Sequence, residues 1–324
     1  MTRRRAGRLA LWVLFVLVVL TVNSAVYNAL TQGHATPPAG LTFVRAGDVD
    51  TRIRTWGTTG SPIVLVPGAF ETADTFDTLA RDLATDHRVY ALDLTGTGYS
   101  EPVAPYDVDH FADQVLGLLA AEGLTGADAP VLVGHSSGAA VAALATLRSK
   151  GTDNEVAGLM VLDGDLRPFP VPRFLRSLVV EPFRTSVLRL GLSSDWLIRQ
   201  VYDSQCGPLC PELTAADVDQ WRRPLLQPGS EAAMWHMSRS GIPSLTGDQL
   251  DELRASDVAK AVAGGEGDPQ FGRSAAEETA TRIGAPAPIF IPGRHLPMIS
   301  SPAALADAVR ALAARAVTGT TRTD

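Results

Sequence analysis

Residues 129–140, Ala-Pro-Val-Leu-Val-Gly-His-Ser-Ser-Gly-Ala-Ala, constrain the fold of this chain more than any other stretch. An apolar run typical of a buried strand leads into Gly-x-Ser-x-Gly and then into an alanine-rich segment that favours a helix. Gly134 and Gly138 leave room for a sharp turn and for close packing of the helix on the strand. Such a turn exposes the Ser136 hydroxyl beside free backbone N–H groups, which is what a serine nucleophile requires.

Short apolar runs alternate with segments of helical periodicity on both sides of this turn. The sequence predicts strands at 41–45, 51–56, 62–68, 88–94, 131–134 and 157–162, and helices at 75–84, 110–122 and 137–149. The pattern resumes with strands at 258–263 and 287–292 and helices at 274–283 and 302–314. The alternation predicts an α/β fold with a mostly parallel central sheet flanked by helices, whose ligands collect at the carboxyl ends of the strands.

Residues 166–256 depart from this pattern, because strand-like runs are missing and aromatic residues lie among amphipathic pieces. We interpret this segment as an inserted helical cap between two parts of the core, 41–165 and 257–318. The aromatic residues are consistent either with an apolar pocket over Ser136 or with burial of the cap on the core. The aromatic residues and the prolines that break the helical pieces are Phe169, Phe174, Phe183, Trp196, Trp221, Trp235, Pro168, Pro170, Pro172, Pro182, Pro224 and Pro228.

The first thirty residues are separate from the fold. Arg3, Arg4, Arg5 and Arg8 precede an apolar stretch that begins at Leu9 and continues to residue 30, an arrangement that directs the rest of the chain out of the cytoplasm. A cleaved signal peptide and an uncleaved membrane anchor over 1–30 both fit. The anchor is favoured, because Val-Asn-Ser at 22–24 is a poor cleavage site. Residues 31–40 then form a linker, and the catalytic body is expected outside the cytoplasm, on a single-pass anchor or, alternatively, secreted.

Charge and cysteine content exclude other classes. The net charge of -7 and the pI near 5.4 argue against a nucleic-acid partner. In an oxidising compartment Cys206 and Cys210, the only cysteines, are expected to close a small loop, with two free thiols as the alternative. The cysteines have no histidines nearby, so they make a weak zinc site, and no metal or organic cofactor is implied.

Three further motifs accompany the Ser136 turn in a fixed order: Val-Pro-Gly-Ala-Phe at 66–70, Asp-Leu-Thr-Gly-Thr-Gly-Tyr-Ser at 93–100, and Ile-Pro-Gly-Arg-His-Leu-Pro at 291–297. Over residues 41–314 their order and spacing resemble the α/β-hydrolase superfamily, in the capped branch that holds epoxide hydrolases, haloalkane dehalogenases, serine esterases and C–C bond hydrolases. The cap matches that branch in character only. We interpret the Gly-x-Gly within 93–100 as a structural loop, since no other feature of a nucleotide site accompanies it.

The resemblance implies a catalytic triad. A serine at position 136 disfavours the epoxide and haloalkane chemistries, which need a carboxylate nucleophile, and favours acyl transfer through an acyl-serine. The family order of Ser, Asp and His makes His295 the base and Asp268, 27 residues before it, the orienting acid. Asp163 and Asp165, which come after the strand that succeeds the Ser136 helix, are alternative acids, and Glu266 is a minor one.

The oxyanion formed in acyl transfer needs two backbone donors, which we assign to the N–H groups of Ser137 and Ala69. Pro67 stands where the family has a structural histidine. The sequence thus predicts a serine hydrolase that acts on an ester of an apolar small molecule. A C–C bond hydrolase, a cofactor-free peroxidase or an acyltransferase would use the same triad, and a catalytically silent, membrane-tethered binding protein is the alternative outside enzymes. The physiological substrate and the oligomeric state are not indicated.

Overall fold

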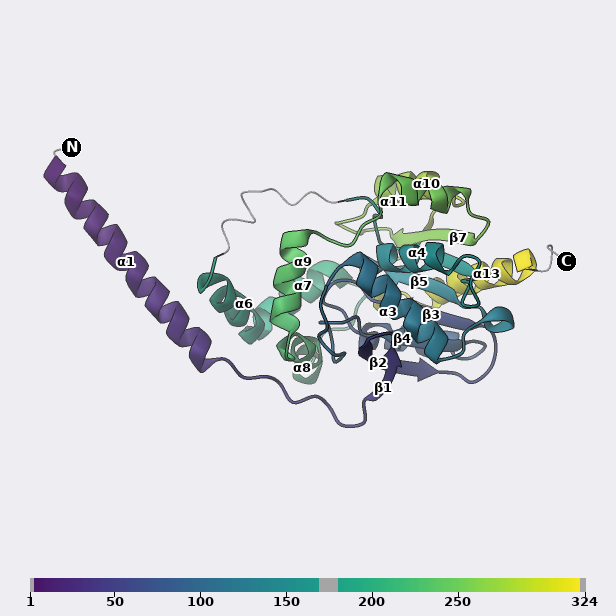
Figure 1. Cartoon of the computed structure of the whole chain (residues 1–324), viewed down its shortest axis with the longest axis horizontal. Helices are drawn as coiled ribbons and strands as arrows, with labels where there is room; N and C mark the ends of the chain where they lie inside the picture. The colour runs from purple at the N-terminus through teal and green to yellow at the C-terminus, as the bar shows by residue number, and fades with distance from the viewer. Residues whose placement is uncertain (1–2, 169–179, 321–324) are drawn as a thin grey trace.

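A computed structural model describes residues 3–168 and 180–320 of the chain (Figure 1). Eight strands form one sheet in the order β1-β2-β4-β3-β5-β6-β7-β8. The strands β3 to β8 run parallel to one another, whereas β2 runs antiparallel to both of its neighbours, β1 and β4. This arrangement confirms the predicted α/β fold. The strands are β1 Thr42–Ala46, β2 Val49–Trp56, β3 Pro62–Val66, β4 Arg88–Leu92, β5 Val131–His135, β6 Gly158–Leu162, β7 Ala259–Gly265 and β8 Ile289–Ile291.

The central strands are apolar on both faces because helices cover both sides of the sheet. Alternate residues of β3 point to opposite layers: Val64 and Val66 join one hydrophobic cluster, and Ile63 and Leu65 join the other. The first layer contains α3 Val108–Ala121, α4 Gly138–Ser149, α10 Gly247–Ala255 and α11 Arg273–Ile283. The second contains α2 Asp77–Leu83 and α13 Pro302–Thr320.

Element bounds differ from the sequence-based expectation in a few places. The last strand is shorter than the predicted 287–292, because Pro288 and Pro292 bound it and neither has a backbone N–H for the ladder. A short 3-10 helix, η1 Ala73–Phe76, precedes α2 where one continuous helix was expected at 75–84. A short helix that was not predicted, α12 Pro297–Ser300, comes after β8.

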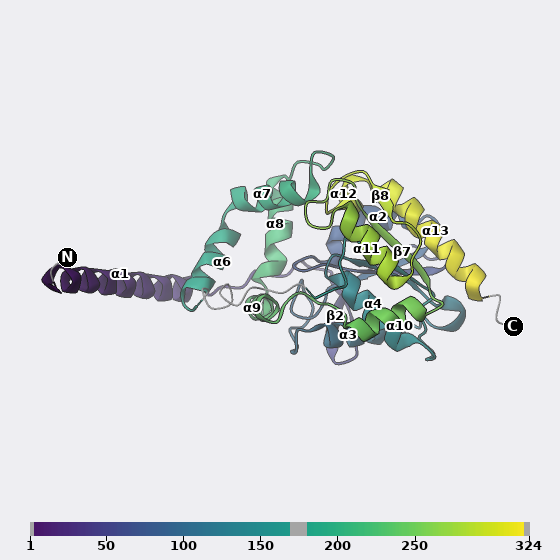
Figure 2. The ribbon, with the colours of Figure 1, turned by 90° about the horizontal axis from the view of Figure 1, so that it is seen from above.

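Between β6 and β7 the chain forms the helices that the sequence assigns to a cap. They are α6 Phe183–Ser193, α7 Asp195–Cys206, α8 Ala215–Arg222, η3 Arg223–Leu226 and α9 Ser230–Ser240. Figure 2 shows them gathered at the end of the body opposite α13. Cys206 and Cys210 form the expected disulfide, which closes the loop after α7. Phe169, Phe174, Pro170 and Pro172 lie outside the described residues.

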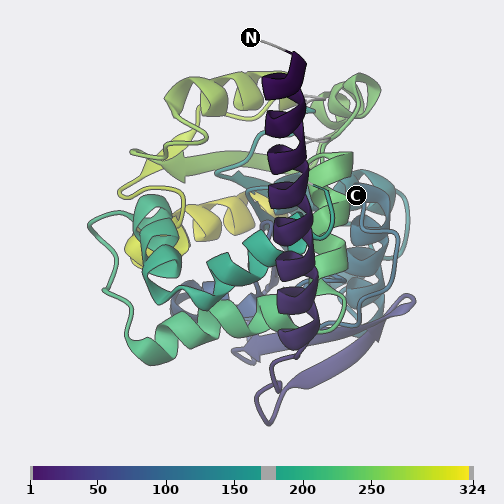
Figure 3. The ribbon, with the colours of Figure 1, turned by 90° about the vertical axis from the view of Figure 1, so that its left-hand side faces the viewer.

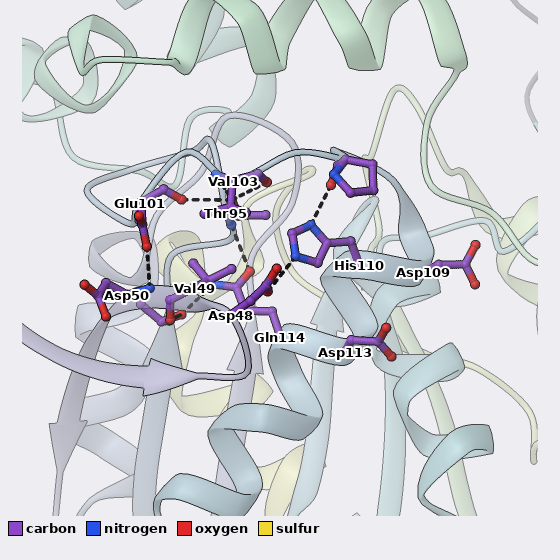
Figure 4. Close-up of polar contacts among 12 residues, drawn as sticks. Asp48, Val49, Asp50, Thr95, Glu101, Val103, Asp109, His110, Asp113 and Gln114 are labelled. Carbon is purple, nitrogen blue, oxygen red and sulfur yellow. Dashed lines mark hydrogen bonds and ion pairs between the residues drawn. The ribbon is translucent and has the colours of Figure 1, made fainter.

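The segment 93–100 is held by contacts within the protein. Asp93 is fully buried and accepts hydrogen bonds from Arg52 and from the backbone N–H groups of Ala73 and Tyr99. Gln114 on α3 accepts from the Thr95 backbone N–H. Figure 4 shows this contact together with the neighbouring His110, which bonds to Asp48 and to the carbonyl of Pro105. These contacts fit a structural loop.

The N-terminal residues form a single helix, α1 Arg3–Leu30, that extends away from the body (Figure 1). Its segment Gly7–Leu30 contains an 18-residue stretch with a mean hydropathy of 2.5 and is long and apolar enough to cross a membrane. A signal sequence near the N-terminus satisfies the same criterion of length and composition. The helix therefore fits both predicted interpretations of residues 1–30.

Candidate active site

Ser136 lies at the sharp turn between β5 and α4. Its φ of 51° falls in the left-handed region, which few residues other than glycine adopt. A Cβ on Gly138 would lie 2.3 Å from the carbonyl oxygen of Pro67, and one on Gly134 would lie 2.5 Å from the carbonyl oxygen of Gly138. Both glycines are therefore required for the close approach of α4 to β3 and β5. The turn holds the Ser136 side chain at the end of the sheet, where it is half-buried.

His295 and Asp268 come together at the same end of the sheet. The loop after β8 carries His295, and the loop after β7 carries Asp268. His295 Nδ1 lies 2.9 Å from Asp268 Oδ2, and both residues are buried. Asp268 Oδ1 also accepts a hydrogen bond from the backbone N–H of Gln270. Burial alone would raise the pKa of Asp268, but the hydrogen bond and the charge of His295, with the bonds from Asp163 and the Gln270 backbone, together outweigh burial and lower it.

The alternative acids lie in different places. Asp165 forms an ion pair with Arg167, and Glu266 is exposed. Asp163, in contrast, is buried beside His295 and Asp268. Within this group, a carboxylate oxygen of Asp163, a carboxylate oxygen of Asp268 and a ring nitrogen of His295 all lie within 4.8 Å of one another. This is the one group of side chains among the described residues with the spacing of metal ligands. The geometry thus brings Asp268 and Asp163 together and separates the other two from His295.

Asp163 has the properties of a neutral carboxylic acid. Burial, and then the neighbouring Asp268, raise its pKa well above the usual range. Two adjacent buried carboxyl groups cannot both ionise cheaply, and Asp268 is the one that bonds to the imidazole. Asp163 Oδ1 accepts the backbone N–H of Gly265, and its backbone has a φ of 44°. A proton on Asp163 therefore leaves one negative charge next to His295.

Two residues beside Ser136 have backbone N–H groups that lack a partner among the described residues. Ala69 and Ser137 both line that cavity, and in the described part of the chain neither amide donates to another residue. The loop that carries Ala69 packs tightly on the serine, because a Cβ at Gly68 would lie 2.9 Å from Ser136 Cβ. Phe70, the next residue, has a φ of 66°. An oxyanion hole requires unpaired backbone donors next to the nucleophile, and these two amides meet that requirement.

Backbone strain is concentrated around this site. Phe70, Ser136 and Asp163 are the non-glycine residues with positive φ among those described. Each comes after a strand of the sheet. Ser136 is the predicted nucleophile, and Phe70 and Asp163 lie beside the predicted donor Ala69 and the predicted acid Asp268. Strained backbone of this kind persists only where the surrounding structure holds it in place, and it is common at functional sites.

The sequence did not single out a second buried pair, Glu71 and His135. His135 is fully buried at the end of β5, where its Nδ1 lies 2.8 Å from Glu71 Oε2 and its Nε2 lies 2.8 Å from the carbonyl oxygen of His295. Glu71 Oε2 also accepts the backbone N–H of Gly68 at 2.8 Å. The pair therefore joins the Ala69 loop, the strand that leads to Ser136, and the His295 loop. The only sequence signal was a histidine directly before the serine of the turn.

The proton positions in this pair are fixed by its partners. The carbonyl of His295 can only accept, so His135 Nε2 carries a proton, and a second proton lies between Nδ1 and the Glu71 carboxylate. Burial alone would lower the pKa of His135 and raise that of Glu71. The attraction between His135 and Glu71, together with their backbone contacts, outweighs burial. It raises the pKa of His135 and lowers that of Glu71. Both shifts favour a buried imidazolium at His135 paired with a carboxylate at Glu71.

A largely apolar cavity of about 740 Å³ lies between the sheet and the cap helices. Ser136, Ser137, Ala69 and His295 form one wall, and Phe271 stacks on the His295 ring at 5.6 Å. Aliphatic residues of the cap form the opposite wall, among them Leu188, Leu192, Ile198, Leu225 and Met237. A hydroxyl, an imidazole and two free amides on one side of an apolar space can perform acyl transfer on an apolar substrate.

Comparisons with known proteins agree on the fold. The model of the family described as "Alpha/beta hydrolase family" matches residues 63–308. Esterase YbfF of Escherichia coli (strain K12) is 39% identical over 100 residues, which cover 30% of this chain and 37% of that protein. The chain thus spans little more than a third of that esterase.

Two solved structures are similar over most of the chain. A membrane phospholipase A, described as a novel bacterial virulence factor, has a TM-score of 0.67 and 20% identity, with 98% of this chain and 99% of that one covered. A thermophilic esterase from Thermogutta terrifontis has a TM-score of 0.65 and 23% identity, with 85% and 97% covered. At these identities the likeness is one of fold.

Proposed function

Because the chain belongs to the alpha/beta hydrolase family, we propose that it is a serine hydrolase that cleaves ester bonds of an apolar small molecule through an acyl-serine intermediate. The observation that carries the proposal is the cavity that Ser136 and His295 line together, with two free amides beside the serine. The relatives described as esterases and as a phospholipase support the same class of reaction.

Ser136 is the proposed nucleophile and His295 the proposed base. Since Asp268 holds His295 Nδ1, the other ring nitrogen, Nε2, is the atom that takes the proton of the Ser136 hydroxyl as its oxygen attacks the ester carbonyl. His295 then gives this proton to the leaving alcohol. Water then loses a proton to His295 as it attacks the acyl carbonyl, and His295 returns this proton to the Ser136 oxygen as the acid leaves.

Charge develops at two places during these steps. The negative charge of Asp268 stabilises the imidazolium that forms at His295. The N–H groups of Ala69 and Ser137 stabilise the oxyanion, and each donor of this type typically contributes about 3 kcal/mol to the transition state. The Glu71 and His135 pair holds both the Ala69 loop and the backbone of His295, so it positions donors and base relative to Ser136.

Covalent labelling tests the nucleophile. A fluorophosphonate probe should label the wild-type protein, and Ser136→Ala should abolish the signal. Ser137→Ala is the matched control, since it removes the neighbouring hydroxyl but keeps the backbone N–H, and it should still be labelled. Hydrolysis of 4-nitrophenyl esters of increasing chain length then tests the reaction. A folded protein that turned over none of these esters would contradict the proposal.

We further infer that residues 1–30 anchor the protein in the cell membrane and that the body lies on the extracytoplasmic side. The apolar helix α1 and the arginines at its N-terminus support this orientation. The disulfide between Cys206 and Cys210 supports an oxidising compartment.

A further inference from the structure

Exposed apolar side chains are concentrated on the cap. Outside α1, eight of the eleven large apolar residues that are exposed in the described structure lie between residues 180 and 242. Five of them belong to α6 and α7, and we call these five the cap apolar surface: Val187, Leu190, Trp196, Leu197 and Val201. A concentration of this kind marks an interaction site rather than the scattered exposure of an ordinary surface.

The cap apolar surface lies next to the end of the membrane-length helix. Ser24 on α1 bonds to Ser186 on α6, Asn28 donates to the carbonyl of Pro182, and Arg189 donates to the carbonyl of Asn28. Figure 2 shows α6 and α7 on the side of the body from which α1 extends, and Figure 3 looks onto this side with α1 in front. The last turns of α1 therefore fix where α6 lies.

The length of α1 that precedes its contacts with α6 can be compared with the thickness of a bilayer. From Gly7 to Asn23 the helix rises about 25 Å, close to the ~30 Å hydrocarbon thickness of a bilayer. The residues that bond to α6 come directly after this length. When α1 spans a membrane, α6 is consequently held at the level of the membrane surface.

The charges of α6 do not oppose contact with lipid. Arg184 pairs with Glu181, and Arg189 pairs with Glu231 through two hydrogen bonds. Because both arginines are paired with glutamates, the exposed face of α6 is mainly apolar. A helix face of this kind suits the boundary between lipid headgroups and acyl chains.

The cavity opens at the same place. Val187, Leu197 and Val201 are exposed on the cap apolar surface and also line the cavity that contains Ser136. An apolar molecule that crossed this rim would stay in contact with apolar side chains from the outside of the cap to the serine.

We propose that the cap apolar surface rests on the bilayer that α1 spans, and that the cavity receives the acyl chain of an ester lipid directly from that bilayer. The first part depends on the position of α1 and α6. The second part rests on the proposed function, because it names the substrate class of the same serine.

Docking is tested with the full chain in phosphatidylcholine vesicles. A thiol introduced by Leu190→Cys is the reactive one, since both native cysteines are in a disulfide, and it can carry an environment-sensitive fluorophore. Leu190 is exposed and does not line the cavity. We expect quenching by nitroxide-bearing lipid and protection from aqueous iodide. The matched control is Phe43→Cys on the edge strand β1, which is similarly exposed and should show the reverse.

Three outcomes of the labelling would overturn the proposal. Quenching of the Leu190 label by iodide alone would place α6 in water. Protection from both quenchers would mean that protein, such as a second copy of this chain, covers the surface. Equal lipid quenching of the Phe43 label would mean that the fluorophore reports non-specific adsorption of the body.

Delivery of substrate is tested by kinetics. Leu190→Glu and Trp196→Glu place charges on the surface but not in the cavity lining. For the double variant we expect a loss of roughly tenfold in the hydrolysis of 4-nitrophenyl palmitate held in vesicles, with soluble 4-nitrophenyl butyrate within about twofold of wild type. Phe43→Glu should change neither rate. No loss on the palmitate, or an equal loss on both esters, would overturn the proposal.

Failure of the proposed function gives a different result. A wild-type protein that hydrolysed neither ester and did not react with fluorophosphonate would remove the serine hydrolase and with it the lipid substrate. The fluorophore at position 190 would still show whether the cap rests on the membrane.

Discussion

Asp163 shows how one residue can matter to a site without taking part in its chemistry. When Asp163 is neutral, the two adjacent carboxyl groups carry a single negative charge. This charge belongs to Asp268, which is hydrogen-bonded to His295. Ionisation of both groups would place two negative charges in the same buried space. The raised pKa of Asp163 therefore favours a proton at this carboxyl group, beside the proposed triad.

Replacement of Asp163 by Asn tests this state. Asn has the shape of the neutral acid, can accept the Gly265 N–H, and tolerates a φ of 44°. In the wild type the folded chain holds a proton at position 163 that the unfolded chain releases above about pH 4, so stability falls as pH rises toward the raised folded-state pKa. Asp163→Asn removes this fall, and its advantage in unfolding free energy should grow with pH.

Chemical denaturation between pH 5 and 9 measures the effect, and ester hydrolysis should stay within about twofold of wild type because the neutral shape is preserved. Asp165→Asn removes a carboxyl two residues away, outside the group, and serves as the matched control. A constant difference in stability across this pH range would mean that Asp163 is ionised in the folded protein.

The sequence predicts a triad of Ser136, His295 and Asp268 because each comes after a strand and lies in a motif with a known chain order. It missed Glu71 and the contacts of His135, since the loop at 66–71 and the turn at 134–138 are distant in sequence and no periodicity links them. It ranked Asp163 as an alternative to Asp268, whereas the geometry puts both beside His295. A spatial arrangement of this type depends on strand order, which residue patterns do not reveal.

At the scale of elements, His110 links the β1–β2 turn to the start of α3 (Figure 4). Its Nδ1 lies 2.6 Å from the carbonyl oxygen of Pro105, and its Nε2 lies 2.9 Å from Asp48 Oδ1. Burial would lower the pKa of His110, but these acceptors outweigh burial and raise it. His110 ties the edge of the sheet to α3 through both nitrogens, and its raised pKa favours the imidazolium form.

The pH dependence of this link has a definite sign. Because the folded-state pKa is above the unfolded value of about 6.5, the link stabilises fully below that pH and is lost as pH rises through the folded-state pKa. Asp48→Asn should therefore lower the unfolding free energy at pH 5.5, by about 1 kcal/mol or less since Asp48 is exposed, and by less at pH 9. Thermal denaturation at the two pH values measures this.

Asp50→Asn is the control for this measurement, since the Asp50 carboxyl pairs with Arg45 instead of a histidine. An equal loss at both pH values would contradict the assignment of the imidazolium.

Helices and strands were well predicted where the hydrophobic period and the segment length agreed, as in the strands of the parallel sheet. Short elements such as η1 and α12 were not, because three or four residues carry no measurable periodicity.

At the scale of the whole molecule, the helix α1 supplies hydrogen-bond partners to the cap. Cleavage after residue 30 would remove Ser24 and Asn28, and with them the partners of Ser186 and Arg189 on the cap. We therefore expect the protein in membranes to keep residues 1–30 and to resist extraction by alkaline carbonate. Intact mass of the purified chain measures this.

A positive control shows that the assay can detect cleavage. The double substitution Val22→Ala and Ser24→Ala creates the small residues that a signal peptidase needs around Asn23, and this variant should lose its N-terminus. A wild-type protein that begins after residue 30 would contradict the anchor.

The sequence indicated the apolar stretch from its composition, but the bonds between α1 and α6 depend on the folded cap.

The hydrogen bond from His135 reaches the backbone carbonyl of His295 and not its side chain. The loop after β8 would keep this attachment whatever amino acid stood at position 295. During divergence such a scaffold could exchange the chemistry of its base while the place of that base stayed the same. The histidine before the serine would then outlast the reaction for which the site was first selected.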